Sequence, residues 1–181
     1  MKLYTLFLLS VALSSFDAPT DHPKSSFPEP PITENHLFYI QRSNDANTVM
    51  YEANVLPDKH LNTELPINVY WIRYAEKGQK EKLSAIQWQL AYGYKQHLNK
   101  NENDFIEISL NSFRNRTLHV FYHEGRPVAV TQISGHRSLL KKIFVQLAST
   151  NSFIPKVRYI DLYGVDMNAK NQPVSERIYI N

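Results

Sequence analysis

Residues 116–135, RTLHVFYHEGRPVAVTQISG, contain two runs of alternating apolar and polar side chains on either side of Glu124-Gly125. Alternation of this kind is typical of strands that bury one face. Gly125 supplies the positive φ that a short hairpin loop requires. Pro127 lacks an N–H, so we expect it at the edge of the return strand. This stretch therefore predicts a β-hairpin.

Further β-type runs lie on both sides of this hairpin. Residues 67–76 carry large apolar groups on both faces, which predicts a central strand that is covered on both sides. Residues 94–98 and 105–110 resemble a second hairpin, although a helix that continues to His97 also fits. The other predicted strands are residues 37–43, 48–55, 139–148, 157–167 and 174–180.

In residues 81–91 the spacing of the apolar side chains changes from the alternation of a strand to the period of a helix. Leu83, Ile86 and Leu90 are three and four positions apart, and Gly93 is a natural stop, so we predict one helix over residues 81–91. The fold class that follows is mainly β, an antiparallel sandwich or barrel of about nine strands with one short helix.

The N-terminal residues indicate export. Met1-Lys2 precedes an apolar run over residues 3–13 and then small residues, which predicts a signal peptide over residues 1–14. Cleavage would release the protein into the periplasm or the extracellular space. The run is too short to span a bilayer and nothing comparable recurs, so we expect no transmembrane segment in the mature chain. Residues 15–35, rich in Pro, Ser and Thr, predict an extended spacer, and residues 36–181 a single β-rich domain.

Composition narrows the function classes. The chain has no cysteine, which excludes a thiol nucleophile and a thiolate metal site and leaves stability to burial. The net charge of +3 is too small to imply nucleic-acid binding. The motifs of zinc proteases, serine hydrolases and phosphate-binding loops do not occur. We therefore predict no cofactor and lean away from an enzyme.

Residues 70–74, YWIRY, form the densest aromatic and cationic group in the chain. Trp71 and Arg73 share a strand face, and Tyr51 and Tyr92 add two rings with polar tips. We predict that these four residues bind a small amphipathic molecule or a glycan, with Arg73 on an anionic group and the rings on the apolar part. Aromatic residues favour strands in any case, so the same side chains would also suit a β core.

His119 and His123 are the secondary ligand-binding candidates. Four residues along a strand separate their Cα atoms by roughly 13 Å, so they cannot bind one metal ion together, and we predict no metal site. A hydrolase would need a carboxylate that converges with a histidine from an adjacent strand in a concave site. The histidines for such a pair are His119, His123 and His136, and the carboxylates are Glu52, Glu107, Asp161 and Asp166.

Four segments carry a resemblance to a known family: FYIQRSNDANTVMYEAN at 38–54, PINVYWIRY at 66–74, LAYGY at 90–94 and LYGVD at 162–166. In this order they resemble an uncharacterised family of small exported bacterial proteins, a domain of unknown function. The resemblance implies export and a β-rich fold, and it brings no catalytic residue.

Three hypotheses of function follow. The first is a non-enzymatic binding domain of the periplasm or cell surface. The second is an envelope hydrolase that uses an Asp or Glu with a His. The third is a structural subunit whose exposed strand edge pairs with an envelope protein.

Overall fold

The computed structural model describes residues 27–97, 105–148, 156–169 and 172–180. These residues form eleven strands of one sheet. The strands are β1 (His36–Arg42), β2 (Asp45–Ala53), β3 (Ile67–Arg73), β4 (Gln79–Lys82), β5 (Tyr94–His97), β6 (Ile106–Leu110), β7 (Phe113–His123), β8 (Arg126–Ile133), β9 (His136–Leu147), β10 (Val157–Asp166) and β11 (Pro173–Tyr179). The prediction of a mainly β domain is confirmed.

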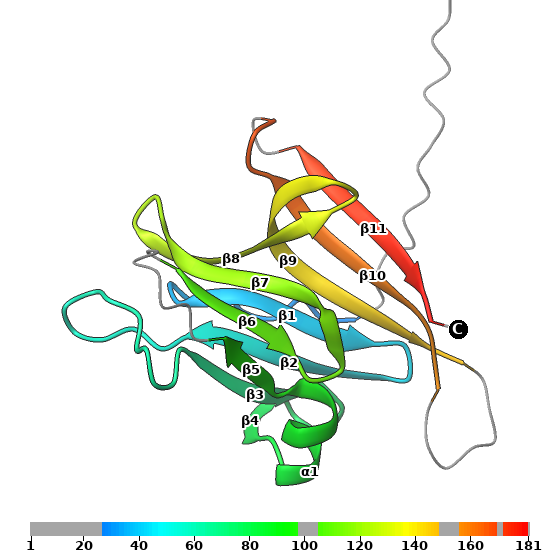
Figure 1. Cartoon of the computed structure of the whole chain (residues 1–181). Coiled ribbons are helices and arrows are strands. Elements are labelled where there is room, and N and C mark those ends of the chain that lie inside the picture. Colours follow the sequence, from blue (N-terminus) through cyan, green and yellow to red (C-terminus); the bar gives the residue numbers. More distant parts are fainter. Residues whose placement is uncertain (1–26, 98–104, 149–155, 170–171, 181) are drawn as a thin grey trace, which may run out of the picture.

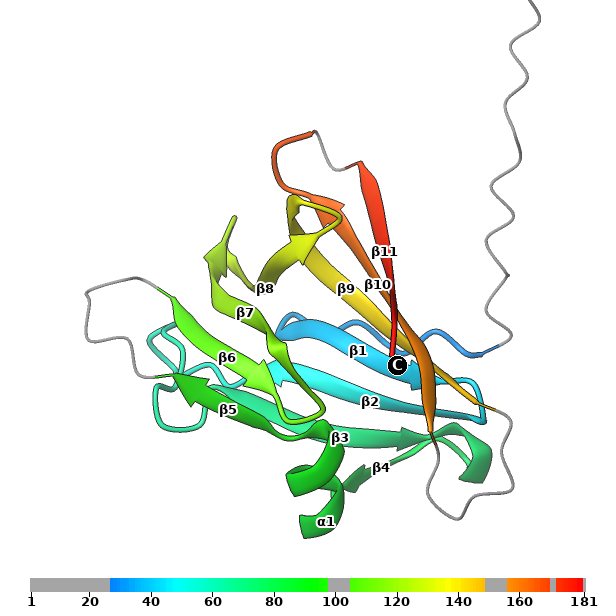
Figure 2. The same ribbon diagram turned by 45° about the vertical axis from the view of Figure 1, so that its right-hand side comes forward.

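The sheet runs in the order β4-β3-β2-β1-β9-β8-β7-β6-β5, with β10 and β11 attached to β9. The strands from β5 to β8 curl back over β1, β2 and β3 (Figures 1 and 2). The Tyr94 hydroxyl on β5 donates to the carbonyl of Ile67 on β3 across 3.1 Å, so the two arms meet. The sheet is thus a half-barrel and not the sandwich or closed barrel expected, and one parallel pair, β1 with β9, makes it mixed.

The hairpin predicted over residues 116–135 is confirmed as β7 and β8. Glu124 and Gly125 both have positive φ, 51° and 78°, as a two-residue turn between twisted strands requires. Pro127 pairs with Tyr122 of β7. The ladder between β8 and β9 begins only at Val130, so Pro127 lies on a free edge of β8.

The hairpin predicted after Gly93 is also confirmed, because β5 pairs with β6 from Tyr94↔Leu110 to His97↔Glu107. The strand predicted over residues 67–76 ends earlier, at Arg73, and continues as a 3-10 turn, η1 (Tyr74–Glu76). Residues 69–72 are buried on both faces as expected. Their strand is nevertheless second from the end of the sheet, and not central.

The predicted helix over residues 81–91 is wrong at its start. Residues 79–82 form β4 on β3. The helical segment is α1 (Ala85–Gln87), which continues as a π-helical turn, η2 (Trp88–Tyr92), after the capping box of Ser84. Ile86 and Leu90, two of the residues that carried the prediction, are each 70% exposed. Both lie in the helical segment, but they do not form its buried face, since Trp88 and Ala91 supply the contacts with the core.

The core fills the concave side of the half-barrel, with residues from β1, β2, β3 and β6 to β10. Tyr51 is fully buried and stacks on Phe38 with 4.3 Å between ring centroids. In the described part of the chain, no helix is long and apolar enough to cross a membrane.

Strand β9 pairs with three other strands and changes partner along one of its edges. One of its edges pairs with β10 along nearly its full length. The other edge pairs with β8 up to Leu139, and then with β1 from Lys142 onward. Leu140 and Lys141 lie between these two ladders. The sheet therefore forks at this point, and β8 and β1 diverge from it.

Residues 27–35, which belong to the predicted spacer, lie against the domain. The Phe27 ring is 6.2 Å from that of Phe144 on β9. The carbonyl of Pro28 accepts a hydrogen bond from the Gln41 side chain at 3.0 Å, and the Thr33 hydroxyl donates to Glu52 at 2.7 Å. This segment brings residues 32–35 to the fork.

Candidate ligand-binding site

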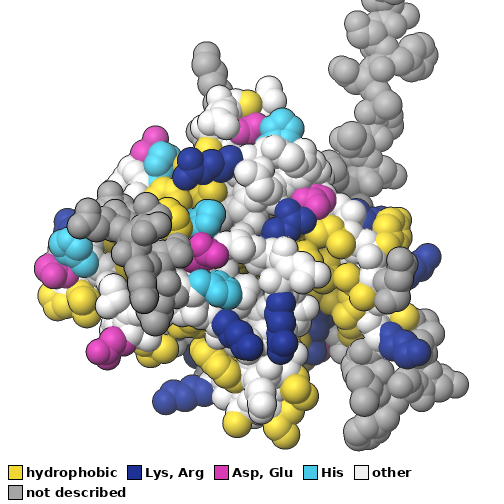
Figure 3. Space-filling view, in the orientation of Figure 1, with side chains coloured by type: hydrophobic (Ala, Val, Ile, Leu, Met, Phe, Trp, Pro, Cys, Tyr) yellow, Lys and Arg dark blue, Asp and Glu magenta, His cyan; other side chains and the backbone are white. Residues whose placement is uncertain are grey.

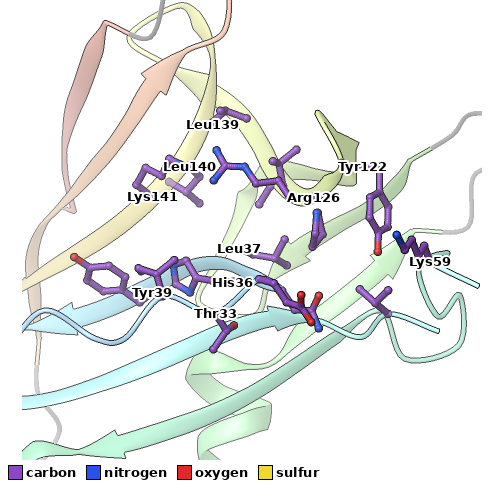
Figure 4. Close-up of a pocket in the computed structure, with 18 residues that line it drawn as sticks. Thr33, His36, Leu37, Tyr39, Lys59, Tyr122, Arg126, Leu139, Leu140 and Lys141 are labelled. Carbon is purple, nitrogen blue, oxygen red and sulfur yellow. The ribbon is translucent and has the colours of Figure 1, made fainter. Parts of the chain in front are cut away.

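The fork encloses a cleft of about 540 Å³ (Figure 4). We call it the fork cleft. Its walls come from residues 32–35, from the first residues of β1 and β8, from residues 139–141 of β9, and from Val55 and Lys59 of the loop after β2. A volume of this size is within the range of small-molecule sites in proteins.

Two β-bulges shape the fork cleft. On β1, His36 pairs with Glu52 and Phe38 with Tyr51, so Leu37 is an extra residue. On β9, Leu140 pairs with Gly164 and Lys142 with Tyr163, so Lys141 is an extra residue. An extra residue bends its strand and redirects the side chains around it. Both redirected residues, Leu37 and Lys141, line the fork cleft.

The floor of the fork cleft is apolar and its ends are aromatic. The buried apolar residues of the lining are Leu37, Val128, Ala129, Leu139 and Leu140. Tyr39 and Tyr122 lie at opposite ends of the site (Figure 4). Burial, followed by the nearby Glu29 carboxylate, raises the pKa of Tyr39 to about 12, so its hydroxyl remains a hydrogen-bond donor at neutral pH. The lining can therefore cover an apolar body and hydrogen-bond a polar group.

Positive charge dominates the polar part of the lining. It contains Lys59, Arg126 and Lys141 and one carboxylate, Glu34. Burial, followed by the nearby Arg126 charge, lowers the pKa of Lys141. Among the described residues, neither Arg126 nor Lys141 forms an ion pair. The fork cleft thus brings two cations together, with neither of them in a salt bridge in the part of the chain that the structure describes.

His36 forms part of the wall between Tyr39 and Leu37 (Figure 4). Burial lowers the pKa of His36 to about 4; the Lys141 charge adds to this effect, and Glu52 opposes it. Its Nδ1 atom is buried and has no hydrogen-bond partner among the described residues. The ring is therefore neutral at pH 7, and it adds a polar group without adding charge.

The aromatic residues predicted to bind ligand meet elsewhere, inside the core. Trp71 is only 2% exposed and contacts the Tyr92 ring edge-on, with 5.0 Å between centroids. The Tyr51 hydroxyl donates to the carbonyl of Tyr92 at 2.6 Å. Arg42 covers this cluster, with its guanidinium 5.0 Å from the Trp71 ring. Trp71 and Tyr92 therefore pack ring against ring, Tyr51 is hydrogen-bonded to the Tyr92 backbone, and none of the three lines the fork cleft.

Arg73, the fourth predicted ligand residue, already has anionic partners. Its guanidinium is 2.8 Å from Glu76 and 3.1 Å from Glu81. It also lies 5.8 Å from the Trp71 ring centroid. The structure thus places Arg73 at the end of β3, with both of its carboxylate neighbours on the surface.

His119 and His123 are both on β7 but have separate neighbours. His119 Nε2 lies 3.9 Å from Glu107 on the paired strand β6, and its ring centroid is 4.6 Å from that of Phe105. His123 Nε2 lies 3.9 Å from Glu124. His119 also lines a second hollow, of about 490 Å³, with Arg116 and Arg137. Within the described ranges, no group of three potential metal ligands occurs.

One histidine and carboxylate pair does converge. His136 Nδ1 at the start of β9 lies 2.7 Å from Asp166 Oδ2 at the end of β10. Asp166 also accepts a hydrogen bond from the Asn168 backbone, which together with His136 lowers the pKa of the Asp166 carboxyl. The Ser138 hydroxyl donates to the His136 carbonyl and not to its ring. The pair ties β9 to the turn after β10.

The sequence matches one family of known proteins. The family described as Domain of unknown function (DUF4833) matches residues 38–177. The chain belongs to this family. Membership confirms the resemblance to an uncharacterised family that the sequence motifs carried. No curated protein and no solved structure matches the chain.

The DUF4833 match begins within β1 and ends within β11. It therefore includes the walls of the fork cleft that come from β8 and β9, with Arg126 and Lys141. The wall formed by residues 32–36 lies before the matched region. Of the charged lining residues, Lys141 belongs to the basic stretch HRSLLKK at 136–142, the one signal of this site that is visible in the sequence.

Proposed function

We propose that this DUF4833 domain is an exported, non-enzymatic binding domain of the periplasm or cell surface. Its ligand is a small amphipathic molecule, and the ligand site is the fork cleft. The observation that carries the proposal is the fork itself. Two bulges open the sheet between β1 and β8, and they leave a cleft with an apolar floor and a polar rim.

The distribution of charge on the surface favours a small ligand over a polyanion such as nucleic acid. On the face shown in Figure 3, Lys, Arg, Asp, Glu and His side chains are interspersed and do not gather into one basic patch. A nucleic-acid site normally requires such a patch. The fork cleft, in contrast, places its cations next to buried leucines.

Ligand-induced stabilisation tests this proposal. A ligand that binds only the folded state raises the free energy of unfolding by about 2.7 kcal/mol at a hundred times its Kd. We expect amphipathic compounds of less than about twenty heavy atoms to raise the Tm. Tyr39→Ala and Tyr122→Ala should reduce that shift.

The matched control is Tyr179→Ala, because Tyr179 on β11 is 64% exposed and does not line the fork cleft. This variant should keep the full shift. A Tm that no amphipathic compound changes, or an equal loss in all three variants, would contradict the proposed site.

Export has its own test. The apolar run at residues 3–13 supports a signal peptide that is removed after Ser14. N-terminal sequencing of the protein recovered from the periplasm or medium should begin near Ser15. Recovery of the intact chain from the cytosol alone would contradict export.

A second candidate function, an envelope hydrolase, has one observation in its favour, the 2.7 Å contact of His136 with Asp166. It predicts hydrolysis of an envelope polymer that Asp166→Asn abolishes while the domain stays folded. Equal turnover by the wild type and this variant would remove it.

A further inference from the structure

We infer that the ligand of the fork cleft is an anion with a single apolar chain, and that Arg126 and Lys141 hold its carboxylate or phosphate head. This inference rests on the proposed function, because it assigns a ligand class to the same site. It goes further in stating the charge of the ligand and the residues that select it.

The two cations come from the two strands that diverge at the fork. Arg126 is the first residue of β8, and Lys141 is the bulge residue of β9. In Figure 4 the Arg126 side chain extends along the wall toward Leu140 and Lys141. Both therefore face the same part of the cleft from adjacent walls.

Of the two cations, Lys141 gives the stronger evidence for an anionic ligand. It is half-buried, which removes part of the water around its ammonium group. Its charged neighbour is Arg126, a like charge. The three partly buried arginines of the described chain have carboxylate partners within 2.8 Å, in the pairs Arg42–Asp45, Arg73–Glu76 and Arg116–Glu176, whereas Arg126 is exposed and has no such partner among the described residues.

An anion between Arg126 and Lys141 would give both cations a partner. Repulsion between two like charges is stronger beside an apolar floor than in water, so the gain from neutralising them is larger there. Guanidinium and ammonium groups together suit a carboxylate or phosphate, since the first can bind two oxygens and the second acts as a point charge.

The apolar chain has a defined place as well. Leu37, Leu139 and Leu140 lie beside the two cations in the lining and are buried. A chain attached to the anion would lie on these side chains, as in other sites where polar groups orient a mostly apolar ligand. A glycan without an anionic group would leave both cations unpaired.

The test compares ligands that differ only in their head group. Octanoate, octyl phosphate, 1-octanol and octylammonium are titrated by calorimetry at pH 7.5 into the full chain. We expect octanoate or octyl phosphate to bind at least tenfold more tightly than 1-octanol, because hydrogen bonds to charged groups are stronger than hydrogen bonds between neutral groups. Octylammonium should not bind measurably. Whichever anion binds more tightly distinguishes a carboxylate ligand from a phosphorylated one.

Variants of the two cations test whether Arg126 and Lys141 cause the preference for an anionic head group. Arg126→Gln and Lys141→Gln should each weaken the binding of the anion by about tenfold and leave the binding of 1-octanol unchanged. The controls are Arg158→Gln on β10 and Lys95→Gln on β5, which are exposed and outside the fork cleft. The Tm without ligand shows that each variant is folded.

The outcomes separate the two proposals. Equal affinity for octanoate and 1-octanol, with loss in Tyr39→Ala, would overturn the anion inference and keep the fork cleft as the binding site. An anion preference that survives in both Arg126→Gln and Lys141→Gln would also overturn it. Binding of none of the four probes would overturn the inference and the proposed function together.

Discussion

At the scale of single residues, His36 shows how the fork cleft differs from ordinary surface. Burial holds the pKa of its ring at about 4, well below the ordinary 6.5. Glu52 on β2 pulls the pKa upward, while Lys141 on β9 pushes it downward. A buried, neutral histidine with an unsatisfied nitrogen costs stability, which is a common property of ligand sites.

His36 therefore predicts a pH dependence. In the unfolded chain the ring takes up a proton below about 6.5, whereas in the folded domain it does so only near 4. The unfolded state binds more protons between these values, so the contribution to stability falls as the pH decreases through that window. We expect the free energy of unfolding of the wild type to fall by about 1–2 kcal/mol more than that of His36→Asn between pH 7 and pH 4.5.

Urea unfolding of both proteins at the two pH values measures this difference. Carboxylates elsewhere in the domain titrate equally in both, so they cancel. Parallel pH profiles for the wild type and His36→Asn would contradict the burial of a neutral ring.

Trp71 tests the distinction between core and ligand site. The buried ring contacts Tyr92 and donates from Nε1 to Gln87 at 3.3 Å. Trp71→Ala should therefore lower the free energy of unfolding by about 3–5 kcal/mol. Leu90→Ala, at an exposed site, should change it by less than about 0.5 kcal/mol. A Trp71→Ala protein with unchanged stability and lost ligand binding would instead support the ligand role predicted from the sequence.

At the scale of elements, the bulge of β9 depends on the strand opposite. Gly164 of β10 pairs with Leu140, next to the extra residue Lys141. A Cβ at position 164 would lie 2.6 Å from the Leu139 carbonyl oxygen and 2.6 Å from the Ile133 side chain. Backbone atoms cannot move as a side chain can, so only glycine fits here without displacing β9.

Gly164→Ala should accordingly destabilise the domain by about 1–3 kcal/mol through overpacking and reduce ligand binding in the fork cleft. Gly135→Ala gives the matched comparison, because Gly135 does not line the fork cleft, its Cβ would meet nothing within 4 Å and only its φ of 81° is unfavourable. That variant should cost about 1 kcal/mol and leave ligand binding intact. Chemical denaturation and calorimetry of both variants check this. Equal effects on binding would contradict the role of the bulge.

At the scale of the whole molecule, residues that lie before the family match also contact the domain. The match starts at residue 38, whereas residues 27–35 already lie against β1 and β9. A chain that starts at Phe27 keeps these contacts and serves as the reference. A chain that starts at His36 loses the Pro28 and Thr33 hydrogen bonds and should be less stable by about 1–3 kcal/mol. Equal Tm values for the two truncated chains would show that residues 27–35 contribute nothing.

Local patterns predicted most of the elements. Alternation and a glycine turn located the hairpin of β7 and β8 and its turn, although β7 begins three residues earlier than predicted, because both signals depend on neighbours in the chain. The helix predicted over residues 81–91 lies at residues 85–92. The prediction was wrong at its start because the apolar spacing that carried it, with Ile86 and Leu90, does not mark the buried face of the segment. Residues 79–82 instead pair with the edge of β3 as a strand, and no local sequence pattern predicts this pairing.

The sequence by itself thus determined a mainly β domain, the order of its hairpins, and membership of an uncharacterised family. Only the tertiary structure decided that β9 changes partner from β8 to β1, because that parallel pairing joins segments far apart in the chain. The tertiary structure also placed Trp71, Tyr51 and Tyr92 in the core, and the divergence of β8 and β1 from β9 opened the fork cleft beside Arg126 and Lys141. A strand's side-chain pattern shows that a face is buried, but the strands that pack around it decide whether that face becomes core or site.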